Sequence, residues 1–156
     1  MADYVKEMRK IIGHDPLMTV GIGVMIENAA GELLLQKRTD DGTWGTLGGG
    51  MNLGETIVET AKREVFEESG LVVDDLELFG IYSGEHCVIT YPNDDVVFGV
   101  IIMFTTRTYS GTLLADPEES AELRFFARDV LPNNLNRTSA KWIEQWKTGA
   151  VPVIVD

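Results

Sequence analysis

Runs of apolar residues separated by short polar or glycine-containing turns occupy much of the chain, which is typical of buried strands in a sheet. Residues 17–26 are nearly continuous in apolar side chains, and the turn at residues 28–31 leads into the next apolar run. Residues 91–95, with a proline, an asparagine and two aspartates, predict a hairpin-like turn. The predicted strands cover residues 17–26, 32–38, 76–83, 86–89, 96–108 and 123–126.

Two segments near the ends of the chain have the 3.6-residue period of an amphipathic helix. The first, residues 2–12, ends at the turn formed by residues 13–16. The second, residues 138–148, carries Trp142 and Trp146 one turn apart, and we interpret these as core anchors rather than base-stacking platforms. The inward positions of the first helix are Tyr4, Val5, Met8 and Ile12.

A third helix is predicted at residues 56–69, which are mostly good helix formers without an internal proline or glycine. Gly70 stands where a left-handed cap would end this helix. Val58, Ala61 and Val65 form an apolar stripe that we expect to pack onto a core.

Strands interleaved with two or three helices predict an α/β fold with a mixed sheet between helical layers. No internal repeat, low-complexity segment or linker interrupts the pattern, so residues 1–156 are expected to form a single domain. Gly21 and Gly23 do not form a dinucleotide-binding fingerprint, because the third glycine is missing and a turn and a strand follow where that motif has a helix.

The charge balance limits the class of partner. The formal net charge of −12 and the pI near 4.5 argue against a nucleic-acid polymer, because phosphate backbones are bound by basic surfaces. A small phosphorylated substrate remains compatible, provided that metal ions and a few lysine or arginine side chains neutralise it locally.

The single cysteine, Cys87, excludes an intrachain disulfide, and with two histidines in the chain it disfavours a structural zinc site. We interpret Cys87 as a small core residue and His14, beside Asp15, as a loop residue without a catalytic partner. No apolar run reaches the roughly 18 residues of a membrane span, and no signal peptide is recognisable, so a cytoplasmic location without membrane contact is expected.

Three carboxylates carry the candidate chemistry. Glu64, Glu67 and Glu68 stand at i, i+3 and i+4, so they project from one helical face and repel one another. Carboxylates select hard cations, and such a face could hold Mg²⁺ or Mn²⁺ with room for water and phosphate oxygens. From the three glutamates alone, a solvated acidic face is the favoured interpretation, because most runs of glutamate on helices are of this kind.

The surrounding residues decide between these interpretations. Gly49, Glu55 and residues 63–71 (REVFEESGL), with five and seven residues in the two gaps, resemble the Nudix box at every fixed position of its signature. Trp44 and the Gly48–Gly49 pair also resemble the residues that precede the box in that family. Leu47 departs from the family, which usually has proline there; this concerns the rigidity of the loop rather than the metal site.

The resemblance implies a Nudix-type α/β/α sandwich and a divalent-metal-dependent hydrolase that cleaves a pyrophosphate linkage in a nucleoside diphosphate joined to another group. The glycines at positions 48–50 would form a tight turn that lets a backbone carbonyl approach the metal. The implied ligands of Mg²⁺ or Mn²⁺ are the Gly48 carbonyl and the side chains of Glu64, Glu67 and Glu68.

The resemblance leaves the general base open between Glu64 and an acid of the loop 118–122, where Glu119 fits best. Arg63 is expected to orient the carboxylates, with Glu55 as its partner, through charge-assisted hydrogen bonds.

Other functions remain as alternatives. A Nudix-like sensor that binds a nucleotide without hydrolysis would require the loss of a box carboxylate, and an acidic interaction protein would not explain the glycines or Arg63. ADP-ribose, an oxidised nucleoside triphosphate, a diadenosine polyphosphate or a nucleotide sugar would present the same pyrophosphate. Trp44, Tyr82 and Tyr91 are candidates for base stacking. The sequence leaves the oligomeric state open, with a homodimer as one option.

Overall fold

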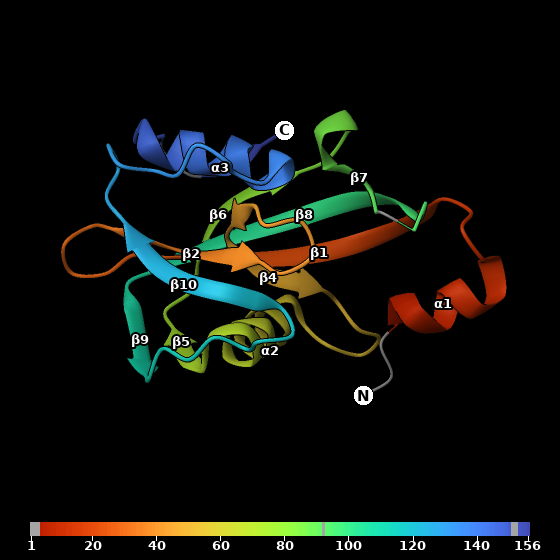
Figure 1. Ribbon diagram of the computed structural model, residues 1–156, viewed down its shortest axis with the longest axis horizontal. Coiled ribbons are helices and arrows are strands. Elements are labelled where there is room, and N and C mark those ends of the chain that lie inside the picture. Colours follow the sequence, from red (N-terminus) through yellow and green to blue (C-terminus); the bar gives the residue numbers. More distant parts are fainter. Residues whose placement is uncertain (1–3, 92, 151–152) are drawn as a thin grey trace.

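A mixed β-sheet lies at the centre of the computed structural model, which describes residues 4–91, 93–150 and 153–156 (Figure 1). The helices are α1 (Tyr4–Ile12), α2 (Ile57–Ser69) and α3 (Arg137–Lys147), with a short 3₁₀ helix η1 (Glu85–Cys87). The strands are β1 (Leu17–Ile26), β2 (Leu33–Arg38), β3 (Trp44–Gly45), β4 (Leu47–Gly50), β5 (Leu71–Asp74), β6 (Glu77–Tyr82), β7 (Val88–Thr90), β8 (Val96–Thr106), β9 (Thr108–Gly111), β10 (Ser120–Phe126) and β11 (Ile154–Val155).

The central sheet has the strand order β11-β6-β8-β1-β4, and β7 pairs with the outer part of β8. β1 and β8 run parallel along the whole of β1, from the pair Leu17–Val97 to the pair Ile26–Thr106. β4 adds to the edge of β1 in the antiparallel direction. A second sheet consists of β10, β2 and β3, and β5 pairs with β9.

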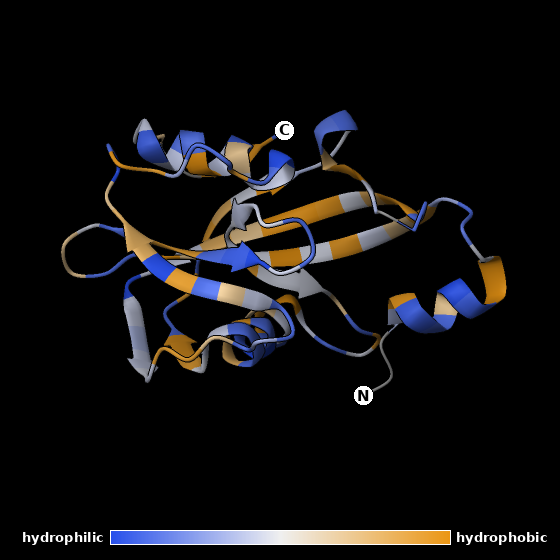
Figure 2. Ribbon diagram, in the orientation of Figure 1, coloured by the Kyte–Doolittle hydropathy of each residue, from blue (hydrophilic) through white to orange (hydrophobic). Residues whose placement is uncertain are grey.

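Helices cover both faces of the central sheet, α3 on one side and α2 on the other (Figure 1). One buried cluster on the α3 side contains Trp142, Ile143 and Trp146, and the other, on the α2 side, contains Ala61 and Val65. Figure 2 shows apolar residues along β1 and β8, between these helical layers. The predicted α/β/α sandwich and the core role of the two tryptophans are therefore confirmed.

Local signals define both ends of α2. Thr56 is the N-cap of a capping box, accepting a hydrogen bond from Glu59 N while its own backbone N–H donates to the Glu59 carboxylate. Gly70 ends the helix in the left-handed conformation, as predicted. The expectation that Val58 packs onto the core is wrong, because it is 42% exposed. The buried face of α2 is centred on Ala61, so Val58 lies at its margin in the first turn.

The predicted strands agree with the structure within a few residues, but the glycine segment does not. Residues 48–50 form the end of the edge strand β4 and not a tight turn, since Gly48, Gly49 and Gly50 pair with Gly23, Ile22 and Gly21. Glycine has a low strand propensity, and here pairing with β1 overrides it. The short strands β3, β5, β9 and β11 were likewise not predicted.

Smaller differences concern the outer elements. The predicted strand 86–89 is wrong in its first half, where Gly84 with φ of 83° turns the chain into η1 before β7 begins. The turn at 91–95 is confirmed by hydrogen bonds from Tyr91 N to Asp95 O and from Asp94 N to Tyr91 O. α1 agrees with the prediction over Tyr4–Ile12, while residues 2 and 3 of the predicted helix lie outside the described residues. α3 begins at Arg137 because the Asn136 side chain caps its first turn.

None of the helices in the described part of the chain has the length and apolar character that a membrane crossing requires.

Candidate active site

The three box carboxylates are buried to very different degrees. Glu68 is 3% exposed, the side chain of Glu64 is 12% exposed, and that of Glu67 is 54% exposed. This gradient follows from the orientation of α2, which turns Ala61, Val65 and Glu68 toward the sheet. The face predicted from the spacing therefore exists, and it runs from the core to solvent.

Glu68 is held by both of its carboxylate oxygens. Oε1 accepts a hydrogen bond from Gln36 Nε2 at 2.8 Å, and Oε2 accepts one from the backbone N–H of Gly48 at 2.7 Å. Burial nevertheless dominates and raises the pKa of Glu68 to about 8, and the negative charges of Glu64 and Glu119 add to this effect. A buried carboxylate beside two others is an environment that a bound cation would stabilise.

The glycines of β4 let the strand pass close to these groups. A Cβ atom at Gly49 would lie 2.5 Å from Oε2 of Glu64, so the Glu64 carboxylate occupies the space beside this glycine. Gly48 has φ of 143°, and a Cβ atom there would lie 2.2 Å from the carbonyl oxygen of Ile22. Position 48 therefore requires glycine, whereas a side chain at position 49 would displace the Glu64 carboxylate. The pKa of Glu64 is raised, chiefly by burial, against the lowering effect of Arg63.

Arg63 donates five hydrogen bonds, four to carboxylates and one to a backbone carbonyl. Nε and Nη2 donate to the two oxygens of Glu55 at 2.7 and 2.9 Å, and Nη2 also donates to the Gly50 carbonyl at 3.1 Å. Nη1 donates to Glu64 at 2.6 Å and to Glu67 at 3.0 Å. These bonds raise the pKa of Arg63 and lower the pKa of Glu55 to about 2. The Arg63–Glu55 contact expected from the sequence is present.

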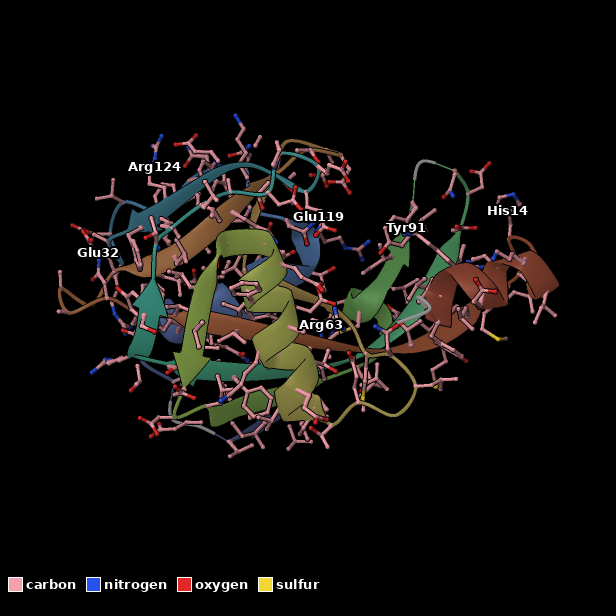
Figure 3. All side chains as sticks on the ribbon, turned by 90° about the horizontal axis from the view of Figure 1, so that it is seen from below. His14, Glu32, Arg63, Tyr91, Glu119 and Arg124 are labelled. Carbon is pink, nitrogen blue, oxygen red and sulfur yellow. The ribbon has the colours of Figure 1, made fainter. Side chains whose placement is uncertain are left out.

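The acidic loop brings one carboxylate toward this site. The charge of Glu119 contributes to the raised pKa values of both Glu64 and Glu68. Figure 3 shows Glu119 and Arg63 on the same side of α2. Glu122, by contrast, pairs with Arg124 on β10. The charge of Glu119 thus acts on two of the three box carboxylates.

The donor set fits a hard divalent cation. Glu64, Glu67 and Glu68 offer carboxylate oxygens, which are the ligands that Mg²⁺ and Mn²⁺ prefer. In residues 4–91, 93–150 and 153–156, no three His, Cys, Asp or Glu side chains converge on one point. Here the Arg63 guanidinium bridges Glu64 and Glu67, while Glu68 is bound to Gln36 and Gly48.

Gln36 and Ser120 belong to the site and were missed from the sequence. Gln36 is 1% exposed on β2, where it contacts Glu68, and Ser120 Oγ donates to Gln36 Oε1 at 2.6 Å. A signal was present, because Gln36 is a single uncharged polar residue directly after three leucines in a predicted strand. Sequence alone did not reveal which group it would meet.

Two of the three base-stacking candidates are wrong. Tyr82 is fully buried and donates its hydroxyl to Gln145, and Trp44 is 6% exposed and packs edge-on against Phe126. Tyr91 remains, since it is 38% exposed and lies on the side of α2 that carries Arg63 (Figure 3).

Cys87 is buried, in agreement with a core role. His14 contacts Asp95 Oδ1 at 2.8 Å rather than its neighbour Asp15, and this contact ties the end of α1 to the β7–β8 turn.

Comparison with known proteins identifies the family. The model of the NUDIX domain matches residues 17–146, which include β1, the whole of α2 and α3 up to Trp146. The chain therefore belongs to the NUDIX domain family, whose members generally use divalent metal ions.

Individual relatives agree with this assignment. A putative 8-oxo-dGTP diphosphatase of Bacillus subtilis is 29% identical over 139 residues, covering 89% of this chain and 87% of that protein. A MutT-like protein of Streptomyces ambofaciens is 40% identical over 67 residues, covering 43% of this chain and 44% of the relative. A nucleoside triphosphate pyrophosphatase/Nudix hydrolase fusion protein of Bifidobacterium longum is matched over 20% of its length. The chain thus spans less than half of the Streptomyces and Bifidobacterium relatives.

A solved structure supports the fold. The MutT NUDIX hydrolase of Burkholderia pseudomallei superimposes with a TM-score of 0.70 at 27% identity, covering 82% of this chain and 97% of that one. The family and these named relatives support a hydrolase acting on phosphoric anhydrides.

Proposed function

We propose that the protein hydrolyses the pyrophosphate linkage of a nucleoside diphosphate joined to another group, by attack of water on phosphorus. The observation that carries the proposal is the packing of Glu64 and Glu68 against Gly48 and Gly49, with Arg63 bonded to Glu64 and Glu67. This arrangement gathers negative charge where a cation and a phosphate oxygen could meet. Nothing in it provides for displacement at a sugar carbon.

The cation would be Mg²⁺ or Mn²⁺, held by Glu64, Glu67, Glu68 and the carbonyl of Gly48. When bound, such an ion offsets phosphate charge, polarises a phosphoryl oxygen and lowers the pKa of a coordinated water. The protein's own contribution is to fix the carboxylates in place. Gln36 and the Gly48 N–H do so for Glu68, and Arg63 does so for Glu64 and Glu67.

Arg63 acts as an orienting residue in this proposal, and Glu55 fixes the plane of its guanidinium. The pair of bonds to Glu55 leaves Nη1 directed at the two box carboxylates. Lysine could not reproduce this arrangement, because its ammonium group has three donors and no fixed plane.

Two residues compete for the role of general base. Glu64 lies against Gly49, partly buried, and its pKa is raised mainly by that burial, which favours a group able to accept a proton near neutral pH. Glu119 is exposed, but its charge reaches both Glu64 and Glu68. We assign the role to Glu64 and keep Glu119 as the alternative.

The proposed substrate is a small nucleotide rather than a polymer. Relatives named as an 8-oxo-dGTP diphosphatase and as oxidized purine nucleoside triphosphate hydrolases support oxidised nucleotides as first candidates. The net charge of −12 disfavours a long polyanion. Tyr91 is the candidate that would contact the base, since its ring is accessible on the side of α2 that carries Arg63.

The test is a screen for phosphate or pyrophosphate release from oxidised and ordinary nucleoside triphosphates, ADP-ribose, diadenosine polyphosphates and nucleotide sugars. Each compound is assayed with Mg²⁺, with Mn²⁺ and with chelator. Turnover of at least one compound that requires metal is expected. Tight nucleotide binding without product from any compound would contradict the proposal and favour a sensor.

Variants then separate the two candidate bases. If Glu64 is the base, Glu64→Gln should bind substrate nearly normally and turn it over slowly, whereas Glu119→Gln should retain most of its turnover. The reverse result would assign the base to Glu119. Full activity in both variants would exclude both assignments.

A further inference from the structure

Gln36 is a buried polar side chain whose hydrogen-bonding groups are all used. Its Nε2 donates to Glu68 Oε1 at 2.8 Å and to the Thr46 carbonyl at 3.4 Å. Its Oε1 accepts from the Ser120 hydroxyl at 2.6 Å. The neighbouring positions Leu34 and Leu35 of the same strand are fully buried and apolar. Burying an amide beside leucines costs free energy unless its polar groups are hydrogen-bonded, so packing alone does not explain a glutamine at this position.

These contacts determine which way the amide faces. The Thr46 carbonyl can only accept, and so can Glu68 when it is ionised, so the nitrogen of Gln36 must face both. The oxygen must then face Ser120, whose hydroxyl donates to it. Ser120 therefore helps to fix the orientation of the Gln36 amide through this hydrogen bond. Any effect of the Ser120 hydroxyl on the Glu68 carboxylate would pass through Gln36.

Ser120 also belongs to the turn that carries Glu119. Its backbone N–H donates to the Asp116 carbonyl at 2.7 Å, and the Asp116 N–H points to the Glu68 carbonyl at 3.4 Å. On the other side of this turn, Thr39 N donates to the Glu119 carbonyl at 3.1 Å. The turn, β2 and the end of α2 are thus linked through a continuous set of hydrogen bonds.

We propose that Gln36, held in its orientation by Ser120, is a positioning residue that fixes the Glu68 carboxylate for binding of the divalent cation. The inference rests on the proposed function, because it assumes that Glu68 binds that cation. Gln36 reaches the cation only through Glu68. Removing the amide would leave Glu68 Oε1 without its buried donor, and the carboxylate would be free to rotate away from its bond with Gly48.

The test is a calorimetric titration of Mn²⁺ and Mg²⁺ into the full chain in the absence of nucleotide. The variants are Gln36→Met, which keeps the length of the side chain, Ser120→Ala, and the two combined. Gln145→Met is the matched control, since Gln145 accepts a hydrogen bond from the buried Tyr82 hydroxyl on the α3 side of the sheet. Thermal melts of all variants accompany the titrations.

Gln36→Met should weaken metal binding by at least about tenfold, the usual size of such an effect for a group that supports a ligand. Ser120→Ala should weaken it to a smaller degree, and in the Gln36→Met background it should have no further effect on metal affinity. Gln145→Met should lower the melting temperature without changing metal affinity. This pattern distinguishes positioning from a general loss of stability.

Two results would overturn the inference: metal affinity of Gln36→Met equal to that of the wild type, or an equal loss of affinity in Gln145→Met. Glu68→Gln tells this failure apart from a failure of the proposed function. If the wild type binds metal and Glu68→Gln does not, the proposed site stands whatever Gln36 does. If Glu68→Gln binds as the wild type does, or if the wild type binds no metal, both proposals fall.

Discussion

Arg63 and Glu55 are joined by two parallel hydrogen bonds, from Nε to Oε1 at 2.7 Å and from Nη2 to Oε2 at 2.9 Å. The Glu55 side chain is 6% exposed, and it also accepts hydrogen bonds from Asn52 N and the Thr60 hydroxyl. Glu55 thus links the segment before α2 to the helix itself. The bidentate pair fixes the guanidinium plane, and with it the direction in which Arg63 meets Glu64 and Glu67.

Replacement of Arg63 by lysine should therefore fail to preserve activity. We expect Arg63→Lys to lower kcat by about 10- to 100-fold, because the bonds to Glu55 and to the box carboxylates cannot all be made by an ammonium group. Lys62→Gln is the control, since Lys62 lies on the same helix as Arg63 and forms an exposed ion pair with Asp74 of β5. Steady-state kinetics and melts decide the point, and wild-type kcat in Arg63→Lys would contradict it.

Glu67 offers a test of the metal site that does not disturb the core. Its side chain is 54% exposed and bonds to Arg63. Glu67→Gln should change the free energy of unfolding by less than about 0.5 kcal/mol, as is usual for surface positions. Turnover should fall by at least about 100-fold, because loss of a residue that only supports a metal ligand already costs up to about 100-fold and Glu67 is proposed as a ligand itself. Glu144→Gln, an exposed position on α3, is the control and should match the wild type in both measurements.

Metal should raise the melting temperature by mass action if it binds the folded chain at the carboxylates. At a concentration 100 times the dissociation constant the gain is about 2.7 kcal/mol, which for a chain of this size corresponds to an increase of about 5 to 10 °C. Chelator should abolish activity and leave the chain folded at 25 °C. Unfolding by chelator would instead indicate a structural ion, and turnover that survives thorough chelation would remove the metal from the mechanism.

The Arg63–Glu55 pair should also make the free energy of unfolding decrease as the pH falls below about 4.5. Arg63 is the main cause that lowers the pKa of Glu55 to about 2, from an ordinary value of 4.5. Because the folded-state pKa lies below the unfolded one, the contribution of Glu55 is complete above about pH 4.5 and is lost as the pH falls toward 2. Denaturant unfolding between pH 7 and 3 measures this contribution.

The comparison variant is Glu55→Gln, which cannot titrate. The difference in unfolding free energy between the wild type and Glu55→Gln should be constant from pH 7 to about 5 and should shrink below that. A difference that stays constant down to pH 3 would mean that Glu55 is not coupled to Arg63 in solution.

The sequence was most informative where a local rule determines local structure. Thr56, Glu59 and Gly70 define the ends of α2 through caps whose partners lie within a few residues. The same helix fixes the spacing of Glu64, Glu67 and Glu68, so their common face could be predicted. The graded burial of these three carboxylates could not, because it depends on how α2 is rotated against the sheet.

Long-range pairing accounts for the errors. Residues 48–50 have the composition of a turn, but they form a strand because they pair with the edge of β1. Gln36 and Ser120 are separated by 84 positions, and their contact exists because β2 and β10 pair. Trp44 and Tyr82 have side chains suited to stacking on a base, but both are buried in the core. The single-domain boundary 1–156, the cytoplasmic location and a homodimer stay predictions.

The position of bond cleavage tests the central claim most directly. The wild-type protein hydrolyses its best nucleotide substrate in ¹⁸O-labelled water with Mg²⁺, and mass spectrometry determines which product carries the label. Because Glu64, Glu67 and Glu68 would hold a divalent cation that favours attack of water on phosphorus, the label should appear in a phosphate-containing product. Label found only in a sugar hydroxyl would contradict the proposed hydrolysis.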